Sequence, residues 1–364
     1  MADQKYFTLN TGAKIPAVGM GCWMGSPGKF DLENGLNVSF DAGYRHFDTA
    51  ALYANEELVG KAIRDSGVPR DQIFVTTKLW NADHSNVEKA FDESLSRLNV
   101  GYIDLYLMHW PQSSGDNVSF VDTWKDMEKL LETRKDKVRA IGVSNFSVKT
   151  LSELLAHAKV VPANNQIETH PYNQDWDVLE LCQKHNIFVT AYTPLGQADS
   201  PILKDKDVLA IAEEIGGDVT PAQVVLSWNV QRGVGVLPKS TNPGRARKNI
   251  QLVTLTDAQM QRIHDITKDP SRQGRLNYVT YDKQSGTVLG WTKEQMGTFL
   301  FNSHRLGKHQ VLWRVTREQS DRRLPCLGRP PQCLARHGRP AASRCRGDRT
   351  LCRGPFAARP AAHG

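Results

Sequence analysis

Short runs of apolar and β-branched residues alternate along most of the chain with longer stretches in which apolar residues recur at helical spacing. The short runs predict eight strands, over residues 18–21, 46–48, 74–78, 105–109, 140–144, 165–167, 188–192 and 234–238. The longer stretches predict helices near residues 33–42, 56–66, 86–98, 121–134, 148–157, 175–185, 205–215, 222–231 and 243–249. Strands that alternate with helices in this way are typical of parallel βαβ units.

A hairpin is predicted at the start of the chain. Residues 6–9 and 15–18 flank a short segment in which Asn10 and Gly12 supply the geometry of a tight turn. Eight βα units in a row favour closure of the sheet, so we predict an α/β fold, a (β/α)₈ TIM barrel with an N-terminal β-hairpin cap. An open doubly wound sheet is the alternative. Against it, no G-x-G-x-x-G sequence follows the first strand, where a dinucleotide-binding sheet carries one.

The composition is that of an ordinary soluble protein, with 40% hydrophobic and 23% charged residues. No run approaches the roughly 18 consecutive apolar residues of a membrane span, and no apolar secretory signal is visible at the start of the chain. We therefore expect a cytoplasmic protein without membrane contact, and a monomer.

The net charge of +7 is unevenly distributed. Residues 298–364 hold 14 Lys and Arg against three acidic residues, a net charge of +11, which leaves −4 for residues 1–297. The tail also lacks sustained hydrophobic periodicity, so it can bury little surface to offset the entropy of ordering. We predict a barrel domain over residues 1–297 and a basic, Arg/Pro/Cys-rich tail over 298–364 that is disordered or an artefact of the gene sequence. A nucleic-acid-binding arm is the alternative for the tail, but we expect no nucleic-acid partner.

The cysteines point to neither a disulfide framework nor a metal site. Cys22 and Cys182, in the body of the chain, lie far apart in sequence, which fits a reducing compartment. The four tail cysteines lack the short C-x₂₋₄-C pairs of a zinc site. The H-x-H and paired-carboxylate clusters of metal-dependent barrel hydrolases are also absent from the sequence, so we predict no metal.

In a barrel of this kind the chemistry takes place at the carboxyl ends of the strands. The residues at those positions are nearly all polar or ionisable: Asp48, Lys78, His109, Ser144, Asn145, Gln166, Tyr192, Lys239 and Ser240. Any one of them can be an ordinary capping or loop residue. The whole set indicates an active site at this end of the barrel.

Four residues near three adjacent strand ends suit carbonyl reduction, which needs a proton donor for the developing alkoxide. Tyr53 lies just past the second strand, and an unperturbed Tyr, with a pKa of about 10, is a poor acid at neutral pH. We expect the Lys78 ammonium to lower the pKa of Tyr53, and the Asp48 carboxylate to hold Lys78 in place. His109 can hydrogen-bond the substrate oxygen. Taken singly, Asp48–Lys78 can be a structural ion pair and Tyr53 a half-buried aromatic, but the four together favour catalysis.

Three segments carry a resemblance to a known family. They are residues 43–50 (GYRHFDTA) with Tyr53, Glu56 and Gly60, residues 138–146 (VRAIGVSNF), and residues 237–240 (LPKS) with Arg245 and Asn249. In this order they resemble the signatures of the aldo-keto reductases, over roughly residues 5–297, and especially the fungal aldehyde reductase and glycerol dehydrogenase members. The resemblance implies a barrel that reversibly reduces aldehydes, and some ketones, with NADPH. It also implies that Asp48, Tyr53, Lys78 and His109 are catalytic.

A nicotinamide cofactor accounts for the other strand-end residues. Tyr192 offers a flat face for stacking, and Ser144, Asn145 and Gln166 offer groups that match a carboxamide. Two cations and a hydroxyl, from Lys239, Arg245 and Ser240, suit a 2′-phosphate and favour NADPH over NADH. The remaining predicted cofactor contacts are Gly21, Cys22, Trp23, Pro194, Leu195, Thr241 and Asn249. Lys248 stands where the family has Glu.

Aromatic residues beside the strand ends predict the walls of a substrate pocket. Trp23, Trp80 and Trp110 resemble the pocket walls of the family, which suit aldehydes and small ketones with an apolar or sugar-like tail. The loop from Trp110 to Trp124 is short, so we expect that side of the pocket to be open. Glyceraldehyde-like and aromatic aldehydes are the first substrates to test. The alternative function is a non-catalytic barrel that senses the cofactor or has a structural role.

We predict that a chain ending at Gly297 folds and keeps its activity, because the eight predicted strands already complete a barrel before the tail begins. The melting temperature and the rate of NADPH turnover, compared between the shortened and the full-length chain, check this prediction. Aggregation or loss of turnover in the shortened chain would show that the tail packs on the barrel.

Overall fold

The computed structural model describes residues 4–24, 29–115, 117–197, 199–277, 281–282 and 285–297. The predicted tail therefore lies outside the described residues. Eight parallel strands form one sheet: β3 (Met20–Gly21), β4 (His46–Asp48), β5 (Phe74–Leu79), β6 (Leu105–Met108), β7 (Ile141–Ser144), β8 (Asn164–Glu168), β9 (Phe188–Tyr192) and β10 (Val234–Leu237). All eight predicted strands are present, with ends that differ by at most two residues from those predicted.

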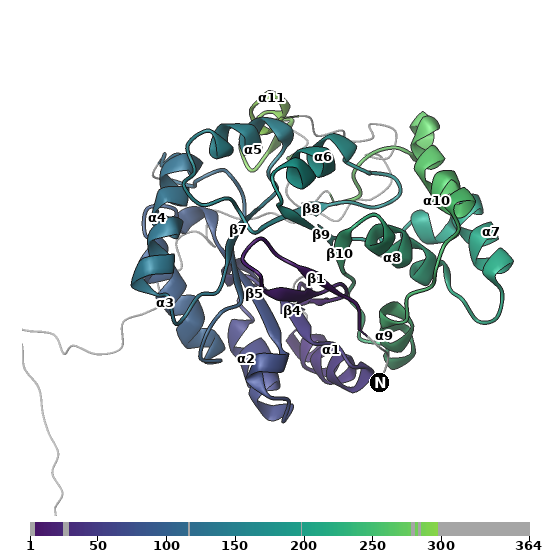
Figure 1. Ribbon diagram of the computed structural model, residues 1–364, viewed down its shortest axis with the longest axis horizontal. Helices are drawn as coiled ribbons and strands as arrows, with labels where there is room; N and C mark the ends of the chain where they lie inside the picture. Colours follow the sequence, from purple (N-terminus) through teal and green to yellow (C-terminus); the bar gives the residue numbers. More distant parts are fainter. Residues whose placement is uncertain are drawn as a thin grey trace, which may run out of the picture. The chain divides into compact units, whose positions relative to one another are not determined.

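The strands lie side by side in chain order, and the two edges of the sheet meet. A parallel bridge joins Val18, just before β3, to Val236 in β10. The backbone N–H of Gly19 donates to the Val236 carbonyl at 2.9 Å, and the Val236 N–H donates to the Ala17 carbonyl at 2.8 Å. These bonds close the barrel, as Figure 1 shows, and exclude the open doubly wound sheet.

Helices surround the strands (Figure 1). They are α1 (Lys29–Ala42), α2 (Glu56–Asp65), α3 (Val87–Leu98), α4 (Phe120–Thr133), α5 (Val148–Leu155), α6 (Trp176–Lys184), α7 (Lys206–Ile215), α8 (Pro221–Gln231), α9 (Pro243–Ile250), α10 (Asp257–His264) and α11 (Lys293–Met296). The nine predicted helices correspond to α1 to α9. No helix in these described ranges is long and apolar enough to cross a bilayer.

The sequence of α10 did not predict a helix, because it has little hydrophobic periodicity and Ile263 is its one buried residue. A local signal for its start was nevertheless available. The Thr256 side chain accepts a hydrogen bond from the Gln259 N–H, and the Gln259 side chain accepts one from the Thr256 N–H. This reciprocal pair is a capping box, which satisfies two N–H groups at the start of a helix.

The helices pack on the barrel through their apolar stripes, and one glycine sets a close approach. In α2, Val59 and Ile63 are buried in the main core. A Cβ at Gly60 would lie 1.8 Å from the Leu98 carbonyl oxygen at the end of α3. Only glycine permits the two helices to meet at this distance, which explains the residue type at this position.

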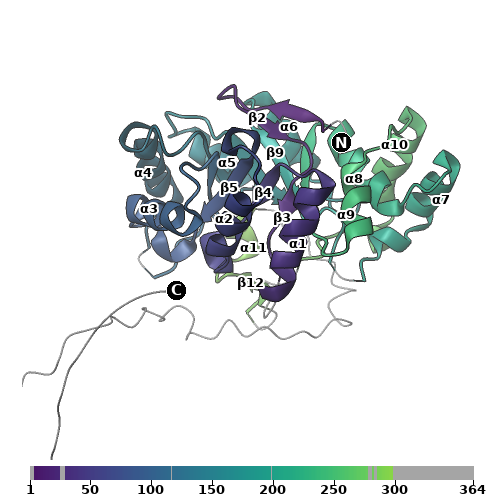
Figure 2. The same ribbon diagram turned by 90° about the horizontal axis from the view of Figure 1, so that it is seen from below.

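Different segments cover the two ends of the barrel (Figure 2). The predicted hairpin, β1 (Tyr6–Thr8) paired with β2 (Lys14–Pro16), packs at the amino ends of the strands, where Leu9 and Ile15 contact Phe74 and Leu105. The segment with β12 (Thr287–Val288) and α11 lies at the other end. The carboxyl ends of the strands are therefore covered by residues from the far end of the described chain.

Candidate active site

A buried ion pair occupies the carboxyl ends of β4 and β5. The Lys78 ammonium donates to Asp48 Oδ1 at 2.5 Å and to the Thr49 carbonyl at 2.8 Å. The second carboxylate oxygen of Asp48 accepts a hydrogen bond from Gln166 Nε2 at 2.6 Å, across the barrel from β8. The Lys78 side chain has no exposed surface and that of Asp48 is 4% exposed. Hydrogen bonds therefore connect three of the predicted residues, Asp48, Lys78 and Gln166.

Burial and hydrogen-bond partners shift the pKa of Asp48 in opposite directions. Burial raises the pKa of the Asp48 carboxyl, and the Lys78 ammonium and the Gln166 amide act to lower it. A buried charge is tolerated only when its partners replace the hydration that it has lost. Each of the two charges here has at least two polar contacts.

The other two predicted catalytic residues lie beside the pair. Tyr53 ends a short 3₁₀ helix, η1 (Ala51–Tyr53), which directly follows β4. The Lys78 Nζ is 5.2 Å from the centre of the Tyr53 ring, and the ring centres of Tyr53 and His109 are 5.7 Å apart. Burial and the Lys78 charge lower the pKa of His109 well below its usual value, so the imidazole is neutral at neutral pH.

The direction expected for the pKa of Tyr53 is wrong. Lys78 lies near the phenol, as expected, but burial and the negative charge of Asp48 raise the pKa of Tyr53 well above 10. The expectation placed Lys78 and Asp48 correctly but omitted the effect of burial, which is the largest cause of the raised pKa. Tyr53 is therefore protonated at neutral pH in the free protein.

A chain of hydrogen bonds connects the residues predicted to bind a carboxamide. The Tyr192 hydroxyl donates to Asn145 Oδ1 at 2.8 Å, and Asn145 Nδ2 donates to the His109 carbonyl at 2.9 Å and to Ser144 Oγ at 3.1 Å. Ser144 Oγ donates to the Gln166 carbonyl at 2.8 Å. Asn145 has a left-handed backbone (φ +64°) directly after β7. Its side chain therefore joins the Tyr192 hydroxyl to the backbone of His109.

The residues predicted to bind a phosphate lie at the end of β10 and in α9. Lys239 and Arg245 are exposed, whereas Ser240 is buried. The side chain of Asn242 caps α9 by accepting a hydrogen bond from the Arg245 N–H at 2.9 Å. Lys248, which differs from the family pattern, forms an ion pair with Asp218.

Two more predicted cofactor residues lie at the two ends of α9, Thr241 just before its start and Asn249 in its last turn. Asn249 is buried, and Thr241 is half-buried and accepts a hydrogen bond from Asn34 Nδ2 at 3.2 Å through its carbonyl. Thr241 and the exposed cations Lys239 and Arg245 therefore belong to one polar segment after the last strand of the barrel.

The residues after β3 lie directly against the ion pair. The Cys22 N–H donates to the Asp48 carbonyl at 2.9 Å, and burial raises the pKa of the Cys22 thiol. A Cβ at Gly21 would lie 3.1 Å from the Leu237 carbonyl oxygen. The Trp23 ring is 43% exposed, and its centre lies 4.9 Å from that of Tyr53. Two strands away, in the loop after β9, Pro194 is buried and Leu195 half-buried.

Aromatic rings surround the candidate catalytic residues, but one side is closed where an opening was expected. The Trp80 ring centre lies 5.4 Å from that of His109, which makes Trp80 a wall of the site. Trp110 is only 5% exposed, because Val288 and Met296 pack against it. The short loop after Trp110 leaves room that residues 285–297 fill, so the expected open side is wrong.

A second buried ion pair at this end of the barrel was not predicted from the sequence. The carboxylate of Glu168, at the end of β8, contacts the Arg275 guanidinium at 3.4 Å, across 107 residues of sequence. His170 also contacts Glu168, with 3.0 Å between Nε2 and Oε1. Nothing near Glu168 in the sequence identifies Arg275 as its partner.

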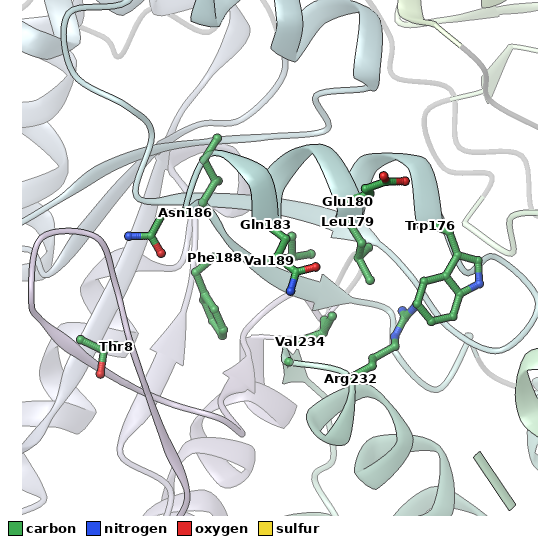
Figure 3. Close-up of a pocket in the computed structure, with 12 residues that line it drawn as sticks. Thr8, Trp176, Leu179, Glu180, Gln183, Asn186, Phe188, Val189, Arg232 and Val234 are labelled. Atoms are coloured by element: carbon green, nitrogen blue, oxygen red, sulfur yellow. The ribbon is translucent and has the colours of Figure 1, made fainter. Parts of the chain in front are cut away.

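A groove of about 320 Å³ lies at the other end of the barrel (Figure 3). Phe188, Val189 and Val234, at the starts of β9 and β10, line it together with residues of α6. The Arg232 guanidinium at its edge stacks on Trp228, 3.9 Å from the ring centre, and donates to the Gln174 carbonyl at 2.9 Å. None of the predicted site residues lines this groove, so it is separate from the candidate active site.

Comparisons with known proteins agree with the fold. The chain matches the Aldo/keto reductase family over residues 18–268. It is 43% identical over 291 residues to glycerol 2-dehydrogenase (NADP(+)) of Saccharomyces cerevisiae, a match that covers 73% of this chain and 91% of that protein. It is also 43% identical over 267 residues to 9,11-endoperoxide prostaglandin H2 reductase of Trypanosoma cruzi, covering 72% and 91% respectively.

A solved structure supports the same family. An aldo-keto reductase of the silkworm Bombyx mori, complexed with NADPH, superposes with a TM-score of 0.68 at 32% sequence identity, covering 73% of this chain and 88% of that one. With the family match and the relatives, this shows that the chain belongs to the Aldo/keto reductase family.

We predict that Lys78→Met lowers the free energy of unfolding by about 3–5 kcal/mol, because it leaves the Asp48 charge buried without its partner. Urea unfolding measures the change. In the double variant Asp48→Leu/Lys78→Met the loss should be smaller, since no charge is then buried. Lys129→Met, which removes an exposed pair with Asp126, is the control and should cost less than about 1 kcal/mol. A Lys78→Met variant as stable as this control would contradict the interpretation.

Proposed function

We propose that the chain reduces aldehydes, and some ketones, to alcohols with NADPH, in a reversible reaction. Tyr53 is the proton donor and His109 orients the carbonyl. The observation that carries the proposal is the placement of the Tyr53 phenol between a buried Lys78–Asp48 pair and a neutral imidazole. The family to which the chain belongs and the names of its relatives support the same reaction class.

The residues present fit NADPH. The half-buried Tyr192 ring offers a face for the nicotinamide. Gln166 Oε1 has no hydrogen-bond partner among the described residues, and Asn145 Oδ1 has a second lone pair beyond the one that Tyr192 uses, so both can accept from a carboxamide N–H. Lys239 and Arg245 are exposed cations that can hold a 2′-phosphate. When bound, NADPH supplies the hydride.

The charges at the site suit a proton donor. Because burial and Asp48 raise the pKa of Tyr53, the phenol keeps its proton until a stronger base, the developing alkoxide, is present. The Lys78 ammonium, 5.2 Å from the ring, then favours the tyrosinate that remains. His109, neutral at neutral pH, can donate a hydrogen bond to the carbonyl oxygen without competing as an acid.

The pocket favours aldehydes with an apolar or sugar-like tail. Trp23 and Trp80 stand beside Tyr53 and His109, and the segment over Trp110 adds an apolar cover. Glyceraldehyde-like and aromatic aldehydes are the proposed substrates, and a cytoplasmic monomer remains our proposal for the protein. The alternative, a barrel that binds cofactor without catalysis, is disfavoured because the four candidate catalytic residues are intact and lie together.

We predict that the purified protein oxidises NADPH when benzaldehyde or glyceraldehyde is added, and that Tyr53→Phe lowers this turnover by about 10²–10⁴-fold. Only the hydroxyl is lost, so NADPH binding, measured by fluorescence, should be unchanged. Near-normal turnover by the Phe variant would exclude Tyr53 as the proton donor. NADPH binding without turnover of any aldehyde or ketone by the original chain would favour the non-catalytic barrel.

We predict that Arg245→Gln weakens NADPH binding by about tenfold to a hundredfold and leaves NADH binding nearly unchanged, because only NADPH carries the 2′-phosphate. Dissociation constants for the two nucleotides, from fluorescence titration, measure the effect. Arg247→Gln, at an exposed arginine in the same helix, is the matched control and should change neither constant. Equal losses for both nucleotides in Arg245→Gln would remove this residue from the phosphate site.

A further inference from the structure

One buried carboxylate at the carboxyl end of the barrel has no part in the chemistry proposed above. Glu168, the last residue of β8, is 1% exposed. Its Oε1 accepts hydrogen bonds from the backbone N–H groups of Leu276 at 2.6 Å and Asn277 at 2.9 Å. Oε1 also lies 3.0 Å from His170 Nε2, and Oε2 accepts from Arg275 Nη1 at 3.4 Å. Three of these four contacts come from a single short segment.

We call residues 274–277 the strap. Besides Glu168, it is fastened at two further points: the Gly274 N–H donates to the Tyr172 carbonyl at 2.7 Å, and Arg275 Nη2 donates to Asp175 Oδ2 at 3.3 Å. All of these partners belong to the end of β8 and the loop that follows it. The strap therefore crosses the barrel end beside β8.

The electrostatics show that Glu168 holds the strap as a charged group. Burial acts to raise the pKa of Glu168, but the hydrogen bond from His170, the Arg275 charge and the strap N–H of Leu276 together lower it below its usual value. A buried ion pair adds little net stability compared with an apolar contact, and its best-attested use is to fix one geometry. The arrangement therefore indicates a positional role for Glu168.

The strap in turn contacts the loop that follows β9, residues 193–197. A Cβ at Gly196 would lie 3.1 Å from Leu276 Cδ1, so the Leu276 side chain packs directly on this loop. Gln197 Nε2 donates to Asn277 Oδ1 at 3.1 Å. Glu168 itself is paired in register with Tyr192, the residue from which the loop starts. One carboxylate is thus connected, through the strap, to the loop that carries Pro194 and Leu195.

We propose that Glu168 is a positioning residue that slows cofactor release: its carboxylate fastens the strap, and the strap holds loop 193–197 against the bound NADPH. This inference rests on the cofactor site proposed above. Charged hydrogen bonds are roughly twice as strong as neutral ones. Replacing the carboxylate by an amide, which also turns N–H groups towards Arg275, loosens the strap without removing any residue of the cofactor site.

The test is the rate constant for NADPH release, measured by stopped-flow fluorescence on the full-length chain. Glu168→Gln should release NADPH about tenfold faster. The control is Asp104→Asn, because Asp104 also holds an arginine, Arg70 at 2.6 Å, and a backbone N–H, that of Val75 at 2.9 Å, but at the amino end of β6. Asp104→Asn should lower the melting temperature about as much as Glu168→Gln does and leave the rate constant for NADPH release unchanged.

A release rate in Glu168→Gln equal to that of the original chain would overturn the inference, and so would equal acceleration in Asp104→Asn. Gln197→Ala removes the exposed hydrogen bond from Gln197 to Asn277 of the strap and changes no buried residue. It should accelerate NADPH release about two- to threefold, and it provides the test if Glu168→Gln fails to fold. Unchanged release in Gln197→Ala would then decide against the inference. Arg245→Gln separates the two proposals: if it weakens NADPH binding while Glu168→Gln releases normally, the cofactor site stands and the positioning role of Glu168 fails.

Discussion

The buried contact between Lys78 and Asp48 is the interaction on which the candidate site depends. Neither charge has access to bulk water, so each needs the other and the polar groups around them. Those groups are the Thr49 carbonyl and the Gln166 amide, which belong to the second and sixth strands of the barrel. A site of this kind exists only when the barrel is closed, because the ion pair and Gln166 meet across its interior. The two charges therefore reach their positions only when the barrel folds.

The same constraint determines how the other groups behave. Burial and the negative charge of Asp48 make the pKa of Tyr53 rise instead of fall. The phenol therefore keeps its proton in the free protein, and the ammonium beside its ring can stabilise the tyrosinate once the proton has left. On the other side of the site, Asn145 accepts a hydrogen bond from the Tyr192 hydroxyl and donates one to the His109 backbone carbonyl, which joins the Tyr192 side chain to the main chain that carries the imidazole. The site is organised before any ligand arrives, which is what electrostatic catalysis requires.

Hydrophobic periodicity predicted the eight strands and their helices because the strands are largely buried and helices such as α2 and α3 present an apolar stripe to the barrel. Strand order then placed Asp48, Lys78 and His109 at one end, since parallel strands in a barrel all end on the same side. The contacts that were not predicted join residues that lie far apart in the sequence. Arg275 meets Glu168 across 107 residues, and Val288 covers Trp110 from the far end of the described chain. The direction of the Tyr53 pKa shift was misjudged for a different reason, because it depends above all on the burial of the phenol, which only the folded structure shows.

The position of the nicotinamide in a complex of this chain with NADPH tests the central claim most directly. A crystal structure of that complex should place the ring against Tyr192 at the carboxyl ends of the strands, with its reactive C4 carbon facing the space between the Tyr53 hydroxyl and His109. The Lys78–Asp48 contact should be unchanged, since the account holds that it is formed before the ligand binds. A nicotinamide bound elsewhere, such as in the groove near Arg232, or a Lys78 that leaves Asp48 when NADPH binds, would contradict the account.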